Sequence, residues 1–251
     1  DAAGGIRVAD TMGNAVFILD AKTGAVLWWT GNTTAGGTPP DLALDDMRYS
    51  IPGDIRIIDV NGDGVLDRFY AADTGGQIWR FDISNDEPQA LADRVTGGRI
   101  ADLQPPASQS AGTAASDNRR FYYPPDVSAI VPPRGRPFHA IAIGSGYRAH
   151  PNDTVVADRI YVIRDYAVNA PPEDEDGSIV YRTLYESDLL DVTARPNVST
   201  LTDDEAKRLA SGWYLSLDDG EKALAGAVTA NGAILLTTFT PAGTSEANTN
   251  E

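Results

Sequence analysis

The chain has 251 residues, of which 42% are hydrophobic, so it is long enough to bury a sizeable core, and we expect a single domain. Its 36 acidic residues outnumber its 20 basic residues and give a formal charge of −16. This charge disfavours binding to nucleic-acid phosphates and anionic lipids and favours divalent cations. The chain has no cysteine, which excludes disulfides and thiol chemistry, and no apolar run long enough to span a bilayer.

The sequence predicts short strands and turns with little helix. In chain order, the expected strands are residues 6–9, 15–19, 26–29, 55–58, 68–72, 77–82, 138–143, 158–163, 223–230 and 233–239. Residues 30–41 and 105–118 are rich in small and polar residues and are expected to be long surface loops. One short helix is expected over residues 203–210, where Thr202 and Glu205 have the spacing of a capping box and Gly212 follows as a stop.

Two segments, residues 12–29 and 72–83, share a degenerate scheme in which a glycine turn leads to an aromatic-rich strand with Asp and Trp. Recurring strands with Trp and Gly at this spacing are typical of β-propeller blades. A four-stranded blade takes about 40–50 residues, so a chain of this length gives five or six blades at most. The predicted fold class is therefore all-β, a partial β-propeller with blades of antiparallel strands.

The most informative segment is DVNGDGVLD, residues 59–67, which has the spacing of a calcium-binding loop. Asp59, Asn61, Asp63 and Asp67 place oxygen-bearing side chains at loop positions 1, 3, 5 and 9, and Val65 offers its carbonyl at position 7. Ca²⁺ takes six to eight oxygen ligands, so the backbone must curl with alternate side chains pointing inward. Gly62 and Gly64 permit that curl.

The loop departs from an EF-hand at position 12, where Tyr70 replaces the bidentate Glu and a strand is expected instead of a second helix. Asp67 must therefore close the site. The simpler interpretation is an ordinary polar turn between two strands, since Asp, Asn and Gly also form such turns. Four ligands in register favour calcium, and they predict a site formed by Asp59, Asn61, Asp63, Val65 and Asp67.

Four segments together resemble one known family: residues 47–83 around the calcium loop, AIGSGYRAHP (142–151), GWYLSL (212–217) and residues 220–241. They are similar, and in the same order, to the C-terminal β-propeller of the PilY family of type IV pilus tip adhesins. The resemblance implies that residues 1–251 are part of one such propeller that lacks further blades. It also implies calcium binding at residues 59–67, linked to control of pilus extension and retraction.

The resemblance further implies a secreted protein at the bacterial surface, at the pilus tip and associated with the outer membrane. The implied partners are the type IV pilus with its minor pilins and an unidentified surface or host ligand, with no nucleic acid and no membrane-spanning segment. No RGD tripeptide is present, so integrin recognition, implied for some family members, has no support here.

An enzyme is the alternative interpretation. Residues 18–28, ILDAKTGAVLW, also resemble the tryptophan docking motif of quinoprotein dehydrogenases, whose propellers bind pyrroloquinoline quinone together with calcium. Trp28 can instead serve a structural purpose, with its indole buried between blades and its N–H bonded to a neighbouring strand. His139 and His150 have no motif partners and are expected to be satisfied polar side chains. We therefore predict no catalytic or organic-cofactor site.

Overall fold

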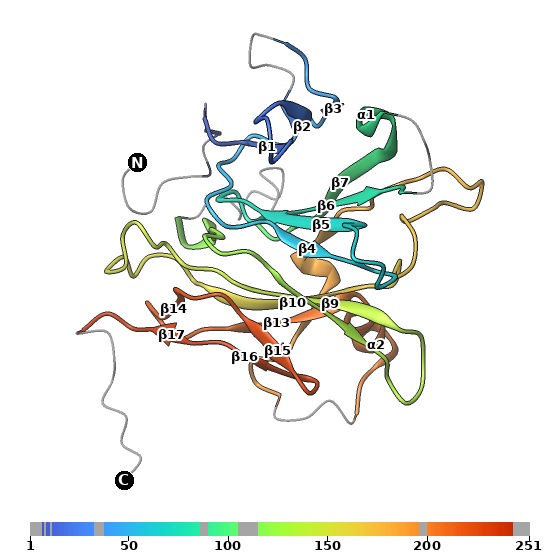
Figure 1. Cartoon of the computed structure of the whole chain (residues 1–251). Helices are drawn as coiled ribbons and strands as arrows, with labels where there is room; N and C mark the ends of the chain where they lie inside the picture. Colours follow the sequence, from blue (N-terminus) through green and yellow to red (C-terminus); the bar gives the residue numbers. More distant parts are fainter. Residues whose placement is uncertain are drawn as a thin grey trace.

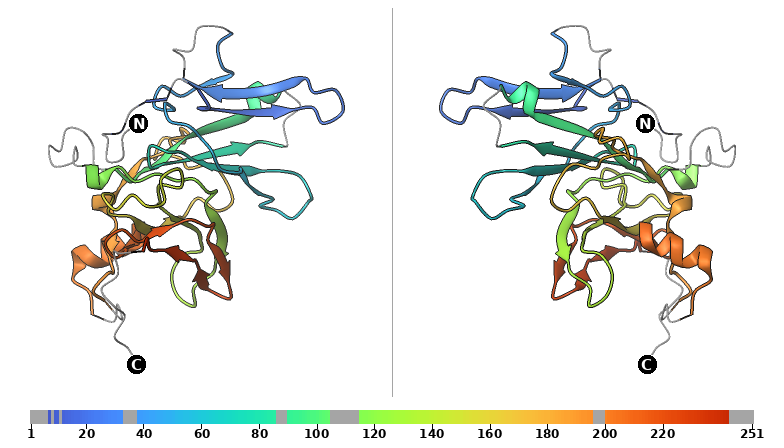
Figure 2. Two further views of the ribbon diagram at one scale, coloured as in Figure 1. Left: turned by 90° about the vertical axis from the view of Figure 1, so that its left-hand side faces the viewer. Right: turned by 90° about the vertical axis from the view of Figure 1, so that its right-hand side faces the viewer.

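The computed structural model describes residues 7, 9–10, 12–32, 38–85, 90–104, 115–195 and 200–242. Its strands form layers, from those within residues 15–43 at the top of Figure 1 to those within residues 222–239 at the bottom. The layers follow chain order except for the short strand at residues 184–185, which joins the second layer. The two side views in Figure 2 show the same succession of layers.

Three sheets make up most of the structure. The first sheet has the order β1-β2-β3 and comprises β1 (Ala15–Leu19), β2 (Val26–Gly31) and β3 (Leu42–Ala43). The second sheet has the order β11-β7-β6-β5-β4 and comprises β4 (Arg56–Ile58), β5 (Arg68–Ala72), β6 (Gln77–Ile83), β7 (Val95–Asp102) and β11 (Leu184–Tyr185). The third sheet has the order β12-β13-β10-β9-β8 and comprises β8 (Asp126–Ile130), β9 (Phe138–Gly144), β10 (Arg159–Asp165), β12 (Leu190–Asp191) and β13 (Gly212–Ser216).

Two short strand pairs and a few helical turns complete the described structure. The pairs are β14 (Lys222–Ala223) with β17 (Thr238–Phe239), and β15 (Val228–Ala230) with β16 (Ala233–Leu235). The α-helices are α1 (Leu91–Arg94) and α2 (Asp203–Ser211), and the 3₁₀ turns are Ala115–Asp117 and Glu186–Asp188.

Strand alternation explains how the layers pack. Successive side chains of a strand point to opposite faces, so a sheet with neighbours on both sides must be apolar on both. In β5, Phe69 and Ala71 pack into the core beside the first sheet, while Tyr70 and Ala72 pack into the core beside the third. The continuous apolar runs of β5 and β9 therefore reflect burial on both faces.

Trp28 joins the first sheet to the second. Its indole is fully buried and makes edge-to-face contacts with Phe69 and Phe81, whose rings stack on each other at a centroid distance of 4.7 Å. The predicted burial of Trp28 is thus confirmed. Its N–H has no hydrogen-bond partner among the described residues, so the expected bond to a neighbouring strand is not found.

The all-β class is confirmed, with little helix. Within the described residues the sheets stack without closing into a ring, so the propeller itself stays a prediction. Strands β3, β7, β8, β11, β12 and β13 were not expected. The segment expected at 223–230 divides into β14 and β15, and the segment expected at 233–239 divides into β16 and β17. Ile6 and Val8 of the expected first strand lie outside the described residues, and Arg7 and Ala9 are not in a strand. Residues 33–37 and 105–114 of the two expected loops also lie outside the described residues, and Thr30 and Gly31, expected in the first loop, are the end of β2.

The expected helix is confirmed as α2, and α1 is an additional helix of a single turn. The capping box predicted for α2 forms reciprocally. The Glu205 N–H donates to the Thr202 hydroxyl at 3.3 Å, and the Thr202 N–H donates to the Glu205 carboxylate at 2.8 Å. The helix ends where Gly212 takes a φ of 144°.

Replacing Trp28 with Ala should lower the free energy of unfolding by about 3–5 kcal/mol, because it leaves a cavity between the first two sheets. Urea denaturation of the chain measures this loss. Trp29→Ala is the matched control, since Trp29 stacks on Phe17, which is half exposed, and should cost roughly 1 kcal/mol. Equal losses in the two variants would contradict the docking role of Trp28.

Candidate functional site

The predicted calcium loop is the connection of a β-hairpin. Strands β4 and β5 pair in antiparallel fashion up to Ile58 and Arg68, and the loop fills the gap between these two residues. The Asp67 N–H donates to the Ile58 carbonyl at 3.1 Å, and the Asp67 carbonyl accepts from the Ile83 N–H at 2.7 Å. The end of the loop is therefore fixed to both β4 and β6.

Asp59 organises the turn. Its carboxylate accepts hydrogen bonds from the backbone N–H groups of Gly62 at 2.6 Å, Asp63 at 3.2 Å and Gly64 at 2.8 Å. Gly62 and Gly64 have φ angles of 79° and 85°, which side chains with a Cβ rarely adopt. These backbone donors, above all the N–H of Gly64, hold the pKa of Asp59 below its ordinary value, so the carboxylate stays charged.

The next two predicted ligands are held by short-range contacts. The Asn61 side-chain oxygen accepts from the Asp63 N–H at 2.9 Å, and its amide nitrogen donates to Asp63 Oδ2 at 3.0 Å. The other Asp63 oxygen accepts from the Val65 N–H at 2.7 Å. Residues 61–65 are all exposed.

Asp67 closes the loop from its far end. One carboxylate oxygen accepts from the Val60 N–H at 2.8 Å, and the other accepts from the Asn85 side chain at 2.8 Å. Asn85 also donates to the Leu66 carbonyl at 3.0 Å. Asn85 follows β6 and was not anticipated, because nothing in its local sequence indicates contact with a loop 18 residues earlier.

The donor set suits a hard cation, since every predicted ligand atom is an oxygen and each carboxylate oxygen has lone pairs beyond its present bonds. Across the described ranges, however, no three His, Cys, Asp or Glu side chains are grouped so that they could hold a metal ion. The carboxylates are each tied to backbone or amide N–H groups instead. The five-residue calcium site therefore stays a prediction.

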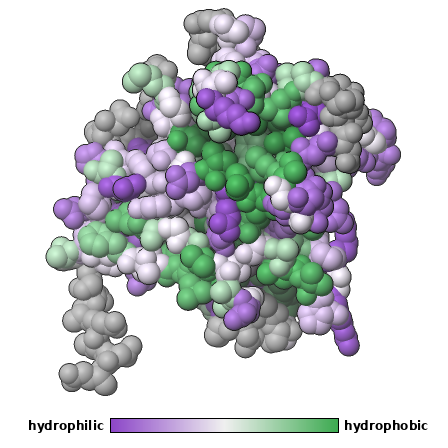
Figure 3. All heavy atoms as spheres, viewed as in Figure 1, coloured by the Kyte–Doolittle hydropathy of each residue, from purple (hydrophilic) through white to green (hydrophobic). Residues whose placement is uncertain are grey.

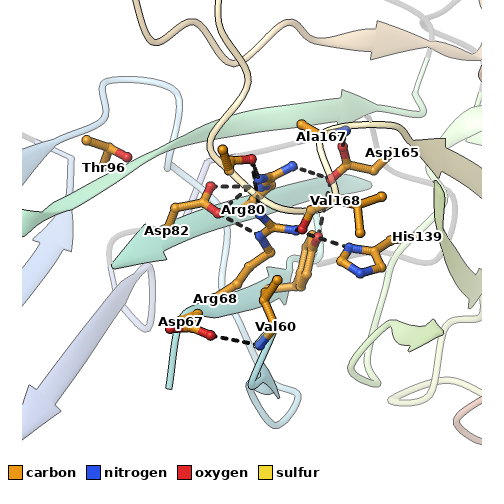
Figure 4. Close-up of polar contacts among 12 residues, drawn as sticks. Val60, Asp67, Arg68, Arg80, Asp82, Thr96, His139, Asp165, Ala167 and Val168 are labelled. Atoms are coloured by element: carbon orange, nitrogen blue, oxygen red, sulfur yellow. Dashed lines mark hydrogen bonds and ion pairs between the residues drawn. The ribbon is translucent and has the colours of Figure 1, made fainter. Parts of the chain in front are cut away.

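Immediately after the loop comes a cluster of charged side chains, which we call the arginine cluster: Arg68, Arg80, Asp82, His139 and Asp165 (Figure 4). All are buried except Asp165, which is partly buried. Arg68 is 1% exposed and donates to Asp82 at 2.6 Å. It also donates to the backbone carbonyls of Val168 at 3.0 Å and Ala170 at 3.2 Å. Arg68 therefore joins β5 to the segment that follows β10.

Arg80 is the second buried cation of the cluster. It forms two hydrogen bonds with Asp82, of 2.8 and 2.9 Å, and it donates to Asp165 at 2.6 Å and to the Ala170 carbonyl at 2.8 Å. Tyr181 adds a hydroxyl bond to Asp82 at 2.8 Å. Two guanidinium groups thus face two carboxylates, and the cluster is balanced in charge.

His139 completes the cluster from β9. Its Nδ1 lies 3.1 Å from Arg68 Nη1, and a guanidinium can only donate, so this nitrogen must accept and carry no proton. Burial, followed by the charge of Arg68, lowers the pKa of His139. The histidine is satisfied in its neutral form, as expected from sequence.

A cleft of about 720 Å³ lies between the loop and the arginine cluster. Asn61 and Asp67 line it from the loop, Arg68 and Asp82 from the second sheet, and Glu173 from the 169–179 segment. On the face seen in Figure 3, hydrophobic residues gather over the middle of the molecule. Residues of the loop and two members of the arginine cluster therefore line one cleft, a relationship that local sequence does not reveal.

Other candidates have structural roles. His150 is exposed, with its ring centroid 4.8 Å from that of Tyr147. Tyr70, at loop position 12, is buried in β5 and donates to Asp165 at 3.2 Å, so it is not a loop ligand. Ser145 is buried, and its hydroxyl donates to Asp158 at 2.7 Å.

Comparison with known proteins places these features in a family context. No family model matches the chain. The Type IV pilus biogenesis factor PilY1 homolog of Xylella fastidiosa is 35% identical over 81 residues, which cover 32% of this chain and 5% of that protein. The Type IV pilus biogenesis factor PilY1 of Pseudomonas aeruginosa is 27% identical over 259 residues, covering 90% of this chain and 21% of that protein.

A solved structure extends the likeness to the fold. The crystal structure of the Pseudomonas aeruginosa PilY1 C-terminal domain matches with a TM-score of 0.61 and 24% identity, over 93% of this chain and 52% of that one. The resemblance to the PilY family C-terminal domain is confirmed. The chain spans about a fifth of the curated Pseudomonas relative and about half of the solved PilY1 domain.

The relatives carry a pilus-related name, and the solved PilY1 domain shows that the fold is shared with this chain. Among the described helices, none is long and apolar enough to cross a membrane.

Acidification should destabilise the protein through His139. Its pKa is lowered in the folded state, so the stability it contributes is present above its ordinary pKa and is lost as the pH falls through and below that value. His139→Asn keeps an acceptor for Arg68 and does not titrate. Urea titrations from pH 7 to pH 5 should therefore show a steeper loss of stability in the parent chain than in the variant.

Parallel pH profiles for the two proteins would contradict this account. The comparison is needed because burial raises the pKa of Asp73 to about 7 and that of Asp158 to about 6. These two groups favour the folded state as the pH falls, and they act equally in both proteins.

Proposed function

We propose that this chain is a calcium-binding domain of a type IV pilus biogenesis factor, and that it supports surface attachment and calcium-dependent control of pilus extension and retraction. The observation that carries the proposal is the hairpin loop between the largely exposed strand β4 and the buried strand β5, in which Asp59, Asn61, Asp63 and Asp67 have the spacing of calcium ligands. The PilY likeness supplies the pilus context.

The residues would share the work of binding as follows. Asp59, Asp63 and Asp67 supply carboxylates, Asn61 an amide oxygen and Val65 its carbonyl. Bound Ca²⁺ supplies positive charge that offsets the repulsion among the three carboxylates. Gly62 and Gly64 keep the backbone curled, and Asn85 donates to Asp67, which lines the cleft beside it.

We place the protein at the bacterial surface in contact with the pilus and its minor pilins, and we propose that it is not an enzyme. Two observations support this choice over a quinoprotein dehydrogenase. The aromatic contacts of Trp28 account for the docking motif without a cofactor. The proposed metal ligands also come from a single exposed loop, whereas a site that holds a planar quinone draws its ligands from several elements.

Calorimetry should detect one Ca²⁺ site in the parent chain and no binding in Asp63→Ala, because that change removes a carboxylate from loop position 5. Mg²⁺ should compete poorly, since its small octahedral shell suits this loop badly. At a Ca²⁺ concentration a hundredfold above Kd, the free energy of unfolding should rise by about 2.7 kcal/mol.

Asp20→Ala is the matched control. Asp20 also accepts two backbone N–H groups in a polar turn, from Lys22 and Thr23 at 2.8 Å each, but its turn lacks the ligand register. This variant should bind Ca²⁺ like the parent. Binding that survives in Asp63→Ala, or is lost in Asp20→Ala, would overturn the ligand assignment.

In the source organism, Asp63→Ala in the chromosomal copy should alter pilus-driven surface motility, because it removes the proposed calcium control. Motility is scored on agar beside the Asp20→Ala strain, with surface piliation measured in both. Unchanged motility in a strain whose protein has lost Ca²⁺ binding would remove the regulatory role and leave the metal site intact.

A further inference from the structure

Two arginines flank the loop, one on each strand of its hairpin, and both reach the third sheet. Arg56 of β4 pairs with Asp126 of β8 at 2.8 Å. Arg68 of β5 contacts His139 of β9 at 3.1 Å and the Val168 carbonyl at 3.0 Å. The loop is therefore bracketed by two links between the second and third sheets.

The groups that accept hydrogen bonds from Arg56 and Arg68 also contact other parts of the structure. Asp126 is buried, and its second carboxylate oxygen accepts from the Thr229 N–H of β15 at 2.7 Å. The Ala170 carbonyl accepts from both Arg68 and Arg80, so the segment after β10 is held by two guanidinium groups at one point. Displacing Arg56 would deprive the buried Asp126 of its ion pair, and displacing Arg68 would deprive the buried His139 of its hydrogen-bond donor.

The loop sets the position of these arginines through the hairpin. Arg68 pairs directly with Ile58 across the hairpin. Asp67, the last predicted ligand, is hydrogen-bonded through its backbone to Ile58 of β4 and to Ile83 of β6. A guanidinium is a rigid planar fork, so its hydrogen bonds tolerate little movement of its backbone. Repulsion among Asp59, Asp63 and Asp67 in a cation-free loop would loosen this end of the hairpin.

We propose that Arg56 and Arg68 transmit the state of the loop to the third sheet, so that a cation in the loop orders residues 165–170 and 126–130. This inference rests on the proposed calcium function and adds the route by which that site acts on the rest of the domain. The coupling is reciprocal, as linkage requires, so breaking an arginine link weakens binding in the loop.

Hydrogen exchange of the whole chain, with Ca²⁺ and with chelator, tests the route. Ca²⁺ should increase protection at residues 54–72, which is the local effect, and also at 165–170 and 126–130, which lie far from the loop in sequence. Protection gained only at 54–72 would overturn the inference and leave the proposed function standing. A calorimetric titration with Ca²⁺ that shows no heat of binding would overturn both this inference and the proposed function.

Single substitutions separate the two links. Arg68→Lys should keep the Ca²⁺-dependent gain in protection at 54–72 but lose the gain in protection at 165–170. It should also weaken Ca²⁺ binding about 5- to 30-fold, within the usual range of coupling between sites. Arg56→Gln should lose the gain at 126–130 alone. The Arg56 side chain is 43% exposed, so this variant is expected to fold even if Arg68→Lys does not.

Arg94→Lys is the matched control for both. Arg94 lies beside the same cleft, but its guanidinium donates to the Ser84 carbonyl, which follows β6, and forms no link to the third sheet among the described residues. The Ca²⁺ affinity of Arg94→Lys, and its protection against hydrogen exchange at 165–170 and 126–130, should equal those of the parent. Equal remote protection in Arg56→Gln and Arg94→Lys would refute transmission through Arg56.

Discussion

The junction between the second and third sheets depends on burying two guanidinium groups at once. Removing a cation from water costs several kcal/mol unless its charge and its N–H groups are satisfied. Arg68 and Arg80 meet this demand with Asp82, Asp165 and backbone carbonyls of the segment after β10. These hydrogen bonds are directional, so the cluster restricts how the two sheets sit against each other.

The apolar layers contribute burial, whereas the charged cluster contributes specificity. Hydrophobic packing between sheets, as around Trp28, is roughly proportional to buried area and allows small shifts. Hydrogen bonds from a planar guanidinium are directional and do not. The second sheet therefore has an aromatic face toward the first sheet, and its face toward the third sheet combines apolar and charged residues. The hairpin loop connects β4 and β5 of this sheet.

The loop combines exposure with a rigid foundation. Residues 61–65 are open to solvent, which suits reversible capture of an ion, while Arg68, one residue beyond the loop, is almost completely buried. A change in the loop therefore cannot be absorbed by flexible neighbours on that side. This contrast between an exposed turn and a buried anchor underlies our proposal that the loop is a regulatory element.

Sequence alone determined what local chemistry specifies: the all-β class, the capped helix α2, the burial of Trp28 and the glycine-bearing turn organised by Asp59. The helix cap and the turn depend on residues within a few positions of one another. The burial of Trp28 was predicted from its local motif, but its partners Phe69 and Phe81 come from another sheet. Tertiary structure decided the rest, including the parallel pairing of β11 with β7, the contact of Asn85 with Asp67 and the arginine cluster. Arginines within the apolar strands RFYAA and QIWRFDI indicate a buried ion pair, but not its partners. Those partners lie up to 102 residues away along the chain, where only the packing of one sheet on another brings them together.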